Sequence, residues 1–132
     1  MNYEDSLKET EKTLEELKEK NKDLPIIVEG EKDVEALQRL GASGRIICIN
    51  QGISLPDFCD MIAREYKKVI ILTDWDKKGG RLCMILKNNL AGRVMCNTIF
   101  RRVLAQYTTI NSVEGLPSWI HTLRERLNSI IP

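Results

Sequence analysis

A short aliphatic run that ends in two aspartates constrains the fold more than any other stretch of the sequence. Residues 68–72 read Lys-Val-Ile-Ile-Leu, and Asp74 and Asp76 follow almost at once. The run does not alternate polar and apolar residues, which predicts a strand buried on both faces of a parallel sheet. Gly79 and Gly80 come next and predict a turn, or a close approach of the backbone to a bound group. Open parallel sheets bind ligands beyond the carboxyl ends of their strands, where the two aspartates would lie.

Strand and helix patterns alternate through most of the chain. Three more apolar runs predict buried strands: 25–28, 45–50 and 93–96. Amphipathic patterns predict helices between the four strands: 31–40, 54–66 and 79–90. This alternation predicts an α/β fold of Rossmann-like type, with a four-stranded parallel sheet flanked by helices. Residues 99–107 fit either a strand or a helix, and Ser118 is expected to cap a last helix.

Residues 1–23 are predicted to form an extra N-terminal helix, ahead of an α/β domain at 24–132 that includes a C-terminal extension. Leu7, Leu14 and Leu17 belong to a repeat with spacings of three and four, which is typical of a coiled-coil seam. Two interpretations remain. The helix packs on the domain's own core, which the shortness of the repeat favours, or it forms a homodimer contact.

Composition narrows the classes of partner. Charged residues make up 30% of the chain and nearly cancel, with a formal net charge of +1. That balance gives no general attraction to nucleic acid or membrane, so a nucleic-acid contact would need a local patch. No apolar run approaches the ~20 residues that span a bilayer, and the start does not resemble a signal peptide. We therefore expect a cytoplasmic protein without a membrane contact. The four cysteines lack the paired spacing of zinc sites and are expected to be buried, reduced thiols.

Acidic residues end two of the predicted strands. Glu29 follows the strand at 25–28, as Asp74 follows the later one. If these strands are neighbours, in the sheet order 2-1-3-4, then Glu29, Asp74 and Asp76 converge on one small region. Three carboxylates with water suit Mg²⁺, or Mn²⁺ in its place, and Glu29 could serve as general acid or base. A metal ion there would offset phosphate charge during phosphoryl transfer.

Basic and aromatic residues near these acids have two interpretations each. Four cations are candidate phosphate ligands, although lysines beside aspartates often only balance charge: Lys32, Lys77, Lys78 and Arg81. Trp75 could stack on a base or pack over the sheet edge. Arg101 and Arg102, beside Phe100 and Tyr107, form a weak basic and aromatic cluster, for which an ordinary solvated face is favoured.

Two segments resemble the motifs of the Toprim domain. Residues 28–37, Val-Glu-Gly-Glu-Lys-Asp-Val-Glu-Ala-Leu, resemble its first motif. Residues 73–79, Thr-Asp-Trp-Asp-Lys-Lys-Gly, resemble its second. The resemblance covers residues 24–97 and is greatest to the small stand-alone Toprim proteins, which are primase-like or ribonuclease-like. It implies a compact α/β fold.

The resemblance also implies roles for particular residues. Glu29 would be the acid or base, and Asp74 and Asp76 would be Mg²⁺ ligands. Gly30, Asp33 and Gly79 would support them, since Asp33 matches an acid common in the primase form of the first motif.

The implied function is a Mg²⁺-dependent catalytic core that acts on phosphodiester bonds of nucleic acid, RNA or DNA. It would be a nuclease or a primase-like nucleotidyl transferase, and a nuclease is favoured because hydrolysis needs only metal, water and a base. Lys78 stands where topoisomerases often carry a third acid, so topoisomerase activity is not expected. The alternative is a non-catalytic nucleic-acid-binding or adaptor protein that keeps the fold.

Overall fold

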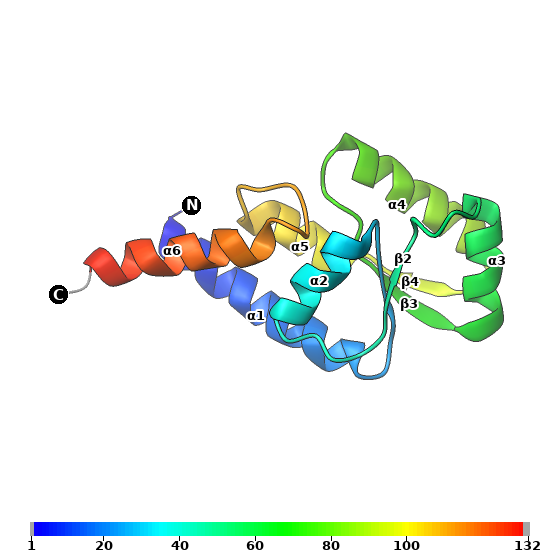
Figure 1. Cartoon of the computed structure of the whole chain (residues 1–132), viewed down its shortest axis with the longest axis horizontal. Coiled ribbons are helices and arrows are strands. Elements are labelled where there is room, and N and C mark those ends of the chain that lie inside the picture. Colours follow the sequence, from blue (N-terminus) through cyan, green and yellow to red (C-terminus); the bar gives the residue numbers. More distant parts are fainter. Residues whose placement is uncertain (1, 131–132) are drawn as a thin grey trace.

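Helices and strands alternate in the computed structural model, which describes residues 2–130 (Figure 1). The elements, in chain order, are α1 (Tyr3–Asn21), β1 (Ile26–Val28), α2 (Glu31–Arg39), β2 (Ile46–Cys48), α3 (Leu55–Glu65), β3 (Lys68–Ile71), α4 (Lys77–Leu90), β4 (Met95–Asn97), α5 (Ile99–Tyr107) and α6 (Leu116–Ile130). The α/β class and the extra N-terminal helix are therefore confirmed.

The four strands form one parallel sheet, as predicted, and their order β2-β1-β3-β4 meets the condition under which Glu29 and Asp74 converge. Ile27 of β1 lies beside Ile47 of β2 on one side and beside Ile71 of β3 on the other. The chain thus moves from β1 to one side of the sheet, and then returns to the other side of β1 for β3. In open sheets, such a reversal leaves a crevice beyond the strand ends.

Helices cover both faces of the sheet and bury it completely at its centre. Ile26 and Val28 point to the face packed by α1, α2, α5 and α6. Ile27 and Ile71 point to the face packed by α3 and α4. All four side chains have no exposed surface, so the unbroken apolar runs are explained by burial on two faces.

The N-terminal helix packs on its own domain. Leu7, Leu14 and Leu17 are buried in the core that α5 and α6 share, and Arg124 of α6 pairs with Glu11. The structure thus agrees with the interpretation that this helix packs on the domain's own core. The homodimer contact and the division of domains at residue 23 stay predictions.

The structure corrects or completes several of the expected elements. Helix α4 begins at Lys77, two residues early, because the Asp76 side chain caps it. Residues 99–107 form a helix, which resolves the ambiguity between strand and helix. Helix α6 begins at Leu116, so Ser118 is not its cap. Pro117 suits the first turn of α6, where a missing N–H has no consequence.

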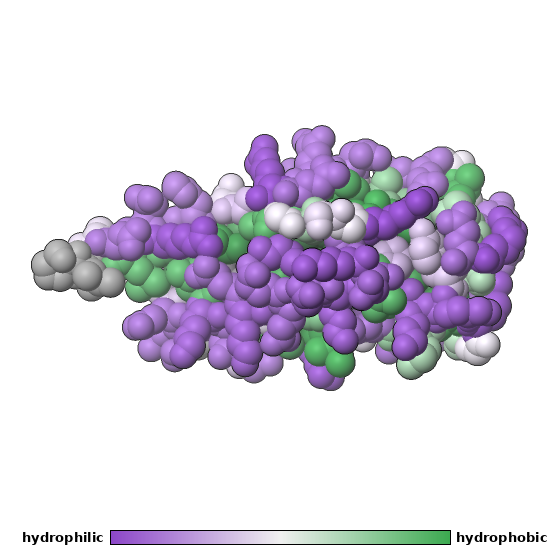
Figure 2. Space-filling model, turned by 90° about the horizontal axis from the view of Figure 1, so that it is seen from below, coloured by the Kyte–Doolittle hydropathy of each residue, from purple (hydrophilic) through white to green (hydrophobic). Residues whose placement is uncertain are grey.

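The surface is mainly polar. Figure 2 shows one face, on which hydrophilic side chains dominate and hydrophobic patches are small and separated. Within residues 2–130, none of the helices combines the length and apolar character that crossing a membrane requires. The cysteines are free thiols. Cys48, Cys59 and Cys83 are buried as predicted, whereas Cys96 is only half-buried.

Asn21 joins the N-terminal helix to the sheet. Its side-chain amide donates to the carbonyl oxygens of Leu24 (3.0 Å) and Arg45 (2.9 Å), and its Oδ1 accepts from the Gly44 N–H (2.9 Å). The residue is 1% exposed. It therefore satisfies the backbone that leads into both β1 and β2.

Replacement of this buried amide should destabilise the fold. Asn21→Ala removes three part-buried hydrogen bonds to the backbone groups at positions 24, 44 and 45, and we expect a loss of about 2–4 kcal/mol in the free energy of unfolding. Urea denaturation measures the loss. Asn128→Ala, at an exposed position of α6, should change stability by less than about 0.5 kcal/mol. Equal effects of the two substitutions would contradict the assignment.

Candidate functional site

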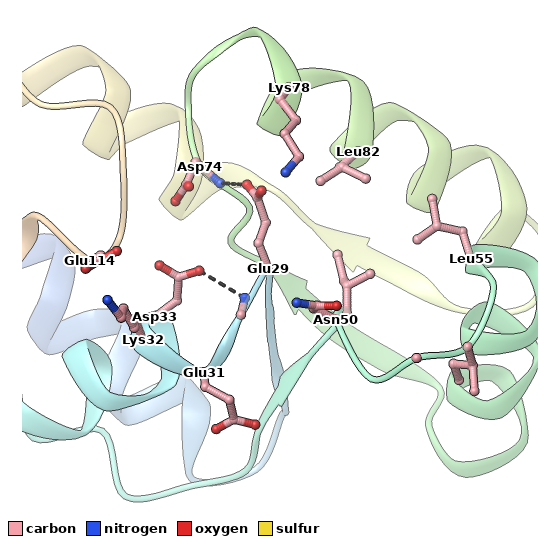
Figure 3. A pocket seen from close by; sticks show the side chains of 14 residues that line it. Glu29, Glu31, Lys32, Asp33, Asn50, Leu55, Asp74, Lys78, Leu82 and Glu114 are labelled. Carbon is pink, nitrogen blue, oxygen red and sulfur yellow. Dashed lines mark hydrogen bonds between the residues drawn. The ribbon is translucent and has the colours of Figure 1, made fainter.

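Two carboxylates meet beyond the ends of the two central strands. Glu29 follows β1 and Asp74 follows β3, and the pairing of these strands brings the two residues together. Glu29 Oε2 accepts a hydrogen bond from the Asp74 backbone N–H at 2.7 Å (Figure 3). This bond holds the Glu29 side chain across the crevice. The predicted meeting of these two acids is confirmed.

Each of these carboxylates keeps one oxygen available to a ligand. Asp74 Oδ1 accepts from the Val113 backbone N–H at 3.0 Å. Asp74 Oδ2 and Glu29 Oε1 accept no hydrogen bond among the described residues, and neither is a buried atom. The backbone thus fixes one oxygen of each acid and leaves the other facing solvent.

Asp33 lies in the first turn of α2 and reaches back toward β1. Its Oδ2 accepts from the Gly30 backbone N–H at 3.1 Å, which satisfies a donor that the helix start leaves open. The residue is 7% exposed. Burial is the main cause that raises the pKa of Asp33, and the nearby charge of Glu114 adds to it. Gly30 and Asp33 therefore support the backbone next to Glu29.

An acidic cleft of about 710 Å³ opens above these residues. In Figure 3 the Lys78 amine points toward Glu29 from one side, and Lys32 lies between Asp33 and Glu114 on the other. The charged side chains that line the cleft are five acids and two lysines: Glu29, Glu31, Asp33, Asp74, Glu114, Lys32 and Lys78. Negative charge is therefore in excess.

The pKa of Asp74 is raised by its burial and by this excess of negative charge. Burial is the largest cause that raises its pKa from 3.8 to about 6, and the charges of Glu29, Asp33 and Asp76 raise it further. The hydrogen bond from Val113 acts in the opposite direction. A cation at the free oxygens would relieve the repulsion among these acids.

Asp76 does not line the cleft, in contrast to the predicted convergence of three acids. Its Oδ1 accepts from the Gly79 N–H at 2.7 Å and caps α4, because the first turn of a helix has unpaired N–H groups that attract a carboxylate. Among the described residues, no three acidic, histidine or cysteine side chains are close enough to hold a metal ion together. The role of Asp76 as a metal ligand stays a prediction.

The donor set nevertheless suits Mg²⁺. That ion prefers oxygen ligands, keeps several water molecules and commonly takes only one or two carboxylates from the protein. Glu29 and Asp74 offer two such oxygens that face solvent. We therefore keep Mg²⁺, with Mn²⁺ as a substitute, as the expected ion.

Gly79 of the glycine pair serves packing within the protein. A Cβ at Gly79 would lie far inside van der Waals contact with the Asp74 carbonyl group, and the buried Thr73 hydroxyl donates to the Gly79 carbonyl at 2.8 Å. Both glycines lie in the first turns of α4 rather than in a turn between elements. The expected close approach is thus to the protein's own backbone.

Only some of the remaining basic and aromatic candidates lie at the cleft. Lys32 and Lys78 line the cleft, whereas Lys77 and Arg81 are exposed and do not. The Trp75 indole donates to the Ile110 carbonyl at 2.6 Å, so it packs within the protein as the second interpretation states.

The sequence favoured an ordinary solvated face for Arg101, but the structure gives this side chain a different place. Its guanidinium donates to the carbonyl oxygens of Thr73 (3.1 Å) and Asp74 (2.8 Å). It therefore holds the loop that carries the site.

Sequence reasoning missed two contributions from the loop before α6. The Val113 N–H positions Asp74, and Glu114 charges the cleft. Neither residue belongs to a motif. The contribution of Val113 is a backbone donor, which carries no side-chain signal, and Glu114 lies outside both of the segments that resemble Toprim motifs. The adjacent strand ends and acidic crevice define an α/β domain with a candidate site for a cation.

Comparisons with known proteins agree with this class. The model of the Toprim domain matches residues 25–107. A UPF0292 protein of Thermoplasma volcanium is 40% identical over 100 residues, which cover 75% of this chain and 84% of that protein. A UPF0292 protein of Methanocaldococcus jannaschii is 34% identical and covers 82% of this chain and 87% of its own.

A solved structure of a putative protein from Aquifex aeolicus is also similar, with a TM-score of 0.68 and 28% identity over 78% of this chain and 94% of that one. The chain therefore belongs to the Toprim domain family and, within it, to the UPF0292 proteins. Membership indicates a function related to nucleic acid and to metal binding.

The two glycines of α4 should respond oppositely to alanine. Gly79→Ala forces the Asp74 backbone to move, and we expect a loss of about 1–3 kcal/mol in the free energy of unfolding. Gly80→Ala places its Cβ 3.6 Å from Arg101 Nη2, an ordinary contact, and should stabilise the helix by about 0.5–1 kcal/mol. Urea denaturation compares them. A Gly79→Ala variant as stable as Gly80→Ala would show that the close packing is unimportant.

The raised pKa of Asp74 predicts that stability falls as the pH rises. Folded Asp74 keeps its proton up to about pH 6, whereas the unfolded chain releases it near 3.8. Between these values the folded state binds more protons, so the free energy of unfolding falls with rising pH. Asp74→Asn avoids this loss and should exceed wild type in stability at pH 7 but not at pH 4.

The measurement is urea denaturation from pH 4 to 7 in a metal chelator. Asp23→Asn, at an exposed position, is the matched control. An Asp74→Asn advantage that stays constant over this range would refute the assigned titration.

Proposed function

We propose that this protein is a Mg²⁺-dependent Toprim catalytic core that cleaves phosphodiester bonds of nucleic acid. The observation that supports it most is the fixed pair Glu29 and Asp74, each with one hydrogen-bonded and one solvent-facing oxygen at the mouth of a cleft. Such an arrangement is pre-organised, because no backbone or side chain must move to present the oxygens.

The cleft's own charge argues for a cation cofactor. Five acids against two lysines would repel a phosphodiester. Glu29 and Asp74 would hold the ion, and Asp76 is near enough to contribute charge at Asp74. When bound, Mg²⁺ would supply neutralisation of phosphate charge.

The chain's own residues then have distinct roles. Where Asp74 holds the ion without Glu29, the free Oε1 of Glu29 takes a proton from the attacking water and returns it to the leaving oxygen. Lys78, which points toward Glu29 (Figure 3), holds a phosphate oxygen. Arg101 and Val113 keep the Asp74 loop in place through its backbone and carboxylate.

The test is cleavage of labelled single-stranded RNA and DNA by purified protein with Mg²⁺ or Mn²⁺. Glu29→Gln and Asp74→Asn should each lower the rate by about 100-fold or more. Glu65→Gln, at an exposed position on α3, should cleave like wild type. Cleavage that survives both site substitutions would refute the proposal.

Metal binding separates a catalyst from an adaptor with the same fold. Mg²⁺ or Mn²⁺ should raise the melting temperature of wild type, because binding to the folded state alone stabilises it. Asp74→Asn should abolish the increase. A protein that binds nucleic acid but shows neither cleavage nor a metal-dependent shift would be the non-catalytic alternative.

A further inference from the structure

A second groove lies between α4 and α5 and carries the opposite charge to the cleft. It has a volume of about 580 Å³. One wall is a face of α4, with Gly80, Met84 and Lys87 at spacings of four and three. The other is a face of α5, with Arg101 and Ala105 four residues apart and Arg102 between them.

The groove is cationic and contains no acid. Lys87, Arg101 and Arg102 line it, together with the polar residues Asn88 and Thr98. None of these three cations takes part in an ion pair among the described residues. In a chain with a formal net charge of only +1, this local concentration of positive charge without an ion pair would attract an anionic partner.

The groove is next to the candidate site. The first turn of α4 separates the two, since Lys78 lines the acidic cleft and Gly80 lines the groove. Arg101 belongs to the groove and also holds the Asp74 carbonyl oxygen at 2.8 Å. A polymer that lies in the groove would therefore pass directly beside the loop that carries Asp74.

We infer that this groove binds the phosphate backbone of a single nucleic-acid strand. Lys87 and Arg102 are exposed and available to phosphates. Met84 is 64% exposed beside them and offers an adaptable apolar surface for a base, which a single strand presents and a duplex does not. The inference rests on the proposed function in taking the bound strand as the substrate of the adjacent site.

The experiment is fluorescence anisotropy with labelled single-stranded RNA and DNA of the same sequence, in a metal chelator so that no cleavage occurs. Lys87→Ala combined with Arg102→Ala should weaken binding about tenfold at low salt. It should also reduce the slope of log K against log salt by about 1.4, since each phosphate contact on a single strand contributes about 0.7. RNA and DNA arms show which strand is preferred.

The matched control is Lys12→Ala combined with Arg64→Ala, which removes the same charges from exposed positions outside the groove. It should bind like wild type, and melting curves verify that both double variants are folded. Groove variants that bind like the control, duplex bound more tightly than single strands, or equal competition by polyglutamate would each overturn the inference.

Failure of the inference is distinct from failure of the proposed function. If the Glu29→Gln variant loses cleavage but still binds the strand, the result supports both the proposed function and the groove. Binding that depends on the groove in a protein that never cleaves supports the groove alone. Cleavage that depends on Glu29 but not on Lys87 and Arg102 supports the catalytic site and refutes the groove.

Discussion

The parallel pairing of β1 with β3 is the constraint on which the rest of the molecule depends. An acid follows the buried apolar residues of each strand, and the adjacency of the strands places Glu29 against the backbone of Asp74 although 45 positions separate them. Because β2 pairs with the other side of β1, the loops after β1 and β3 diverge to opposite sides and leave a crevice between them. The same pairing buries the strands on both faces, so the site lies at the edge of the most deeply buried part of the protein.

Backbone N–H groups hold this edge together where side-chain ion pairs do not. Glu29, Asp33 and Asp74 each accept from one backbone donor, supplied by Asp74, Gly30 and Val113. Such bonds orient the carboxylates but do not neutralise them. Burial, with the remaining repulsion from Glu29, Asp33 and Asp76 added to it, raises the pKa of Asp74 to about 6. A site of this kind sacrifices some stability near neutral pH for charge held in place, as is common where a cation or proton is handled.

The first turn of α4 organises two surfaces of opposite charge. Asp76 caps it, and Gly79 lets it approach the Asp74 backbone more closely than any side chain would permit. As a result, Lys78 is presented to the acidic cleft while Gly80 opens the basic groove on the other side. Arg101 joins the two through the Asp74 carbonyl. Substrate binding and chemistry would thus share one small loop.

The sequence by itself determined the class of fold and placed Glu29 and Asp74 at strand ends, because unbroken apolar runs and strand-end acids are local patterns. The sequence also carried the Toprim motifs. The two acids meet only because β1 and β3 are neighbours, and the tertiary structure decided that strand order. The tertiary structure alone decided which acids face the cleft. Asp76 caps the start of α4, where the first turn has unpaired N–H groups. Val113, Glu114 and Arg101 join the site from segments with no motif. Their contributions are backbone donors and long-range contacts, which only packing brings together and which no local pattern encodes.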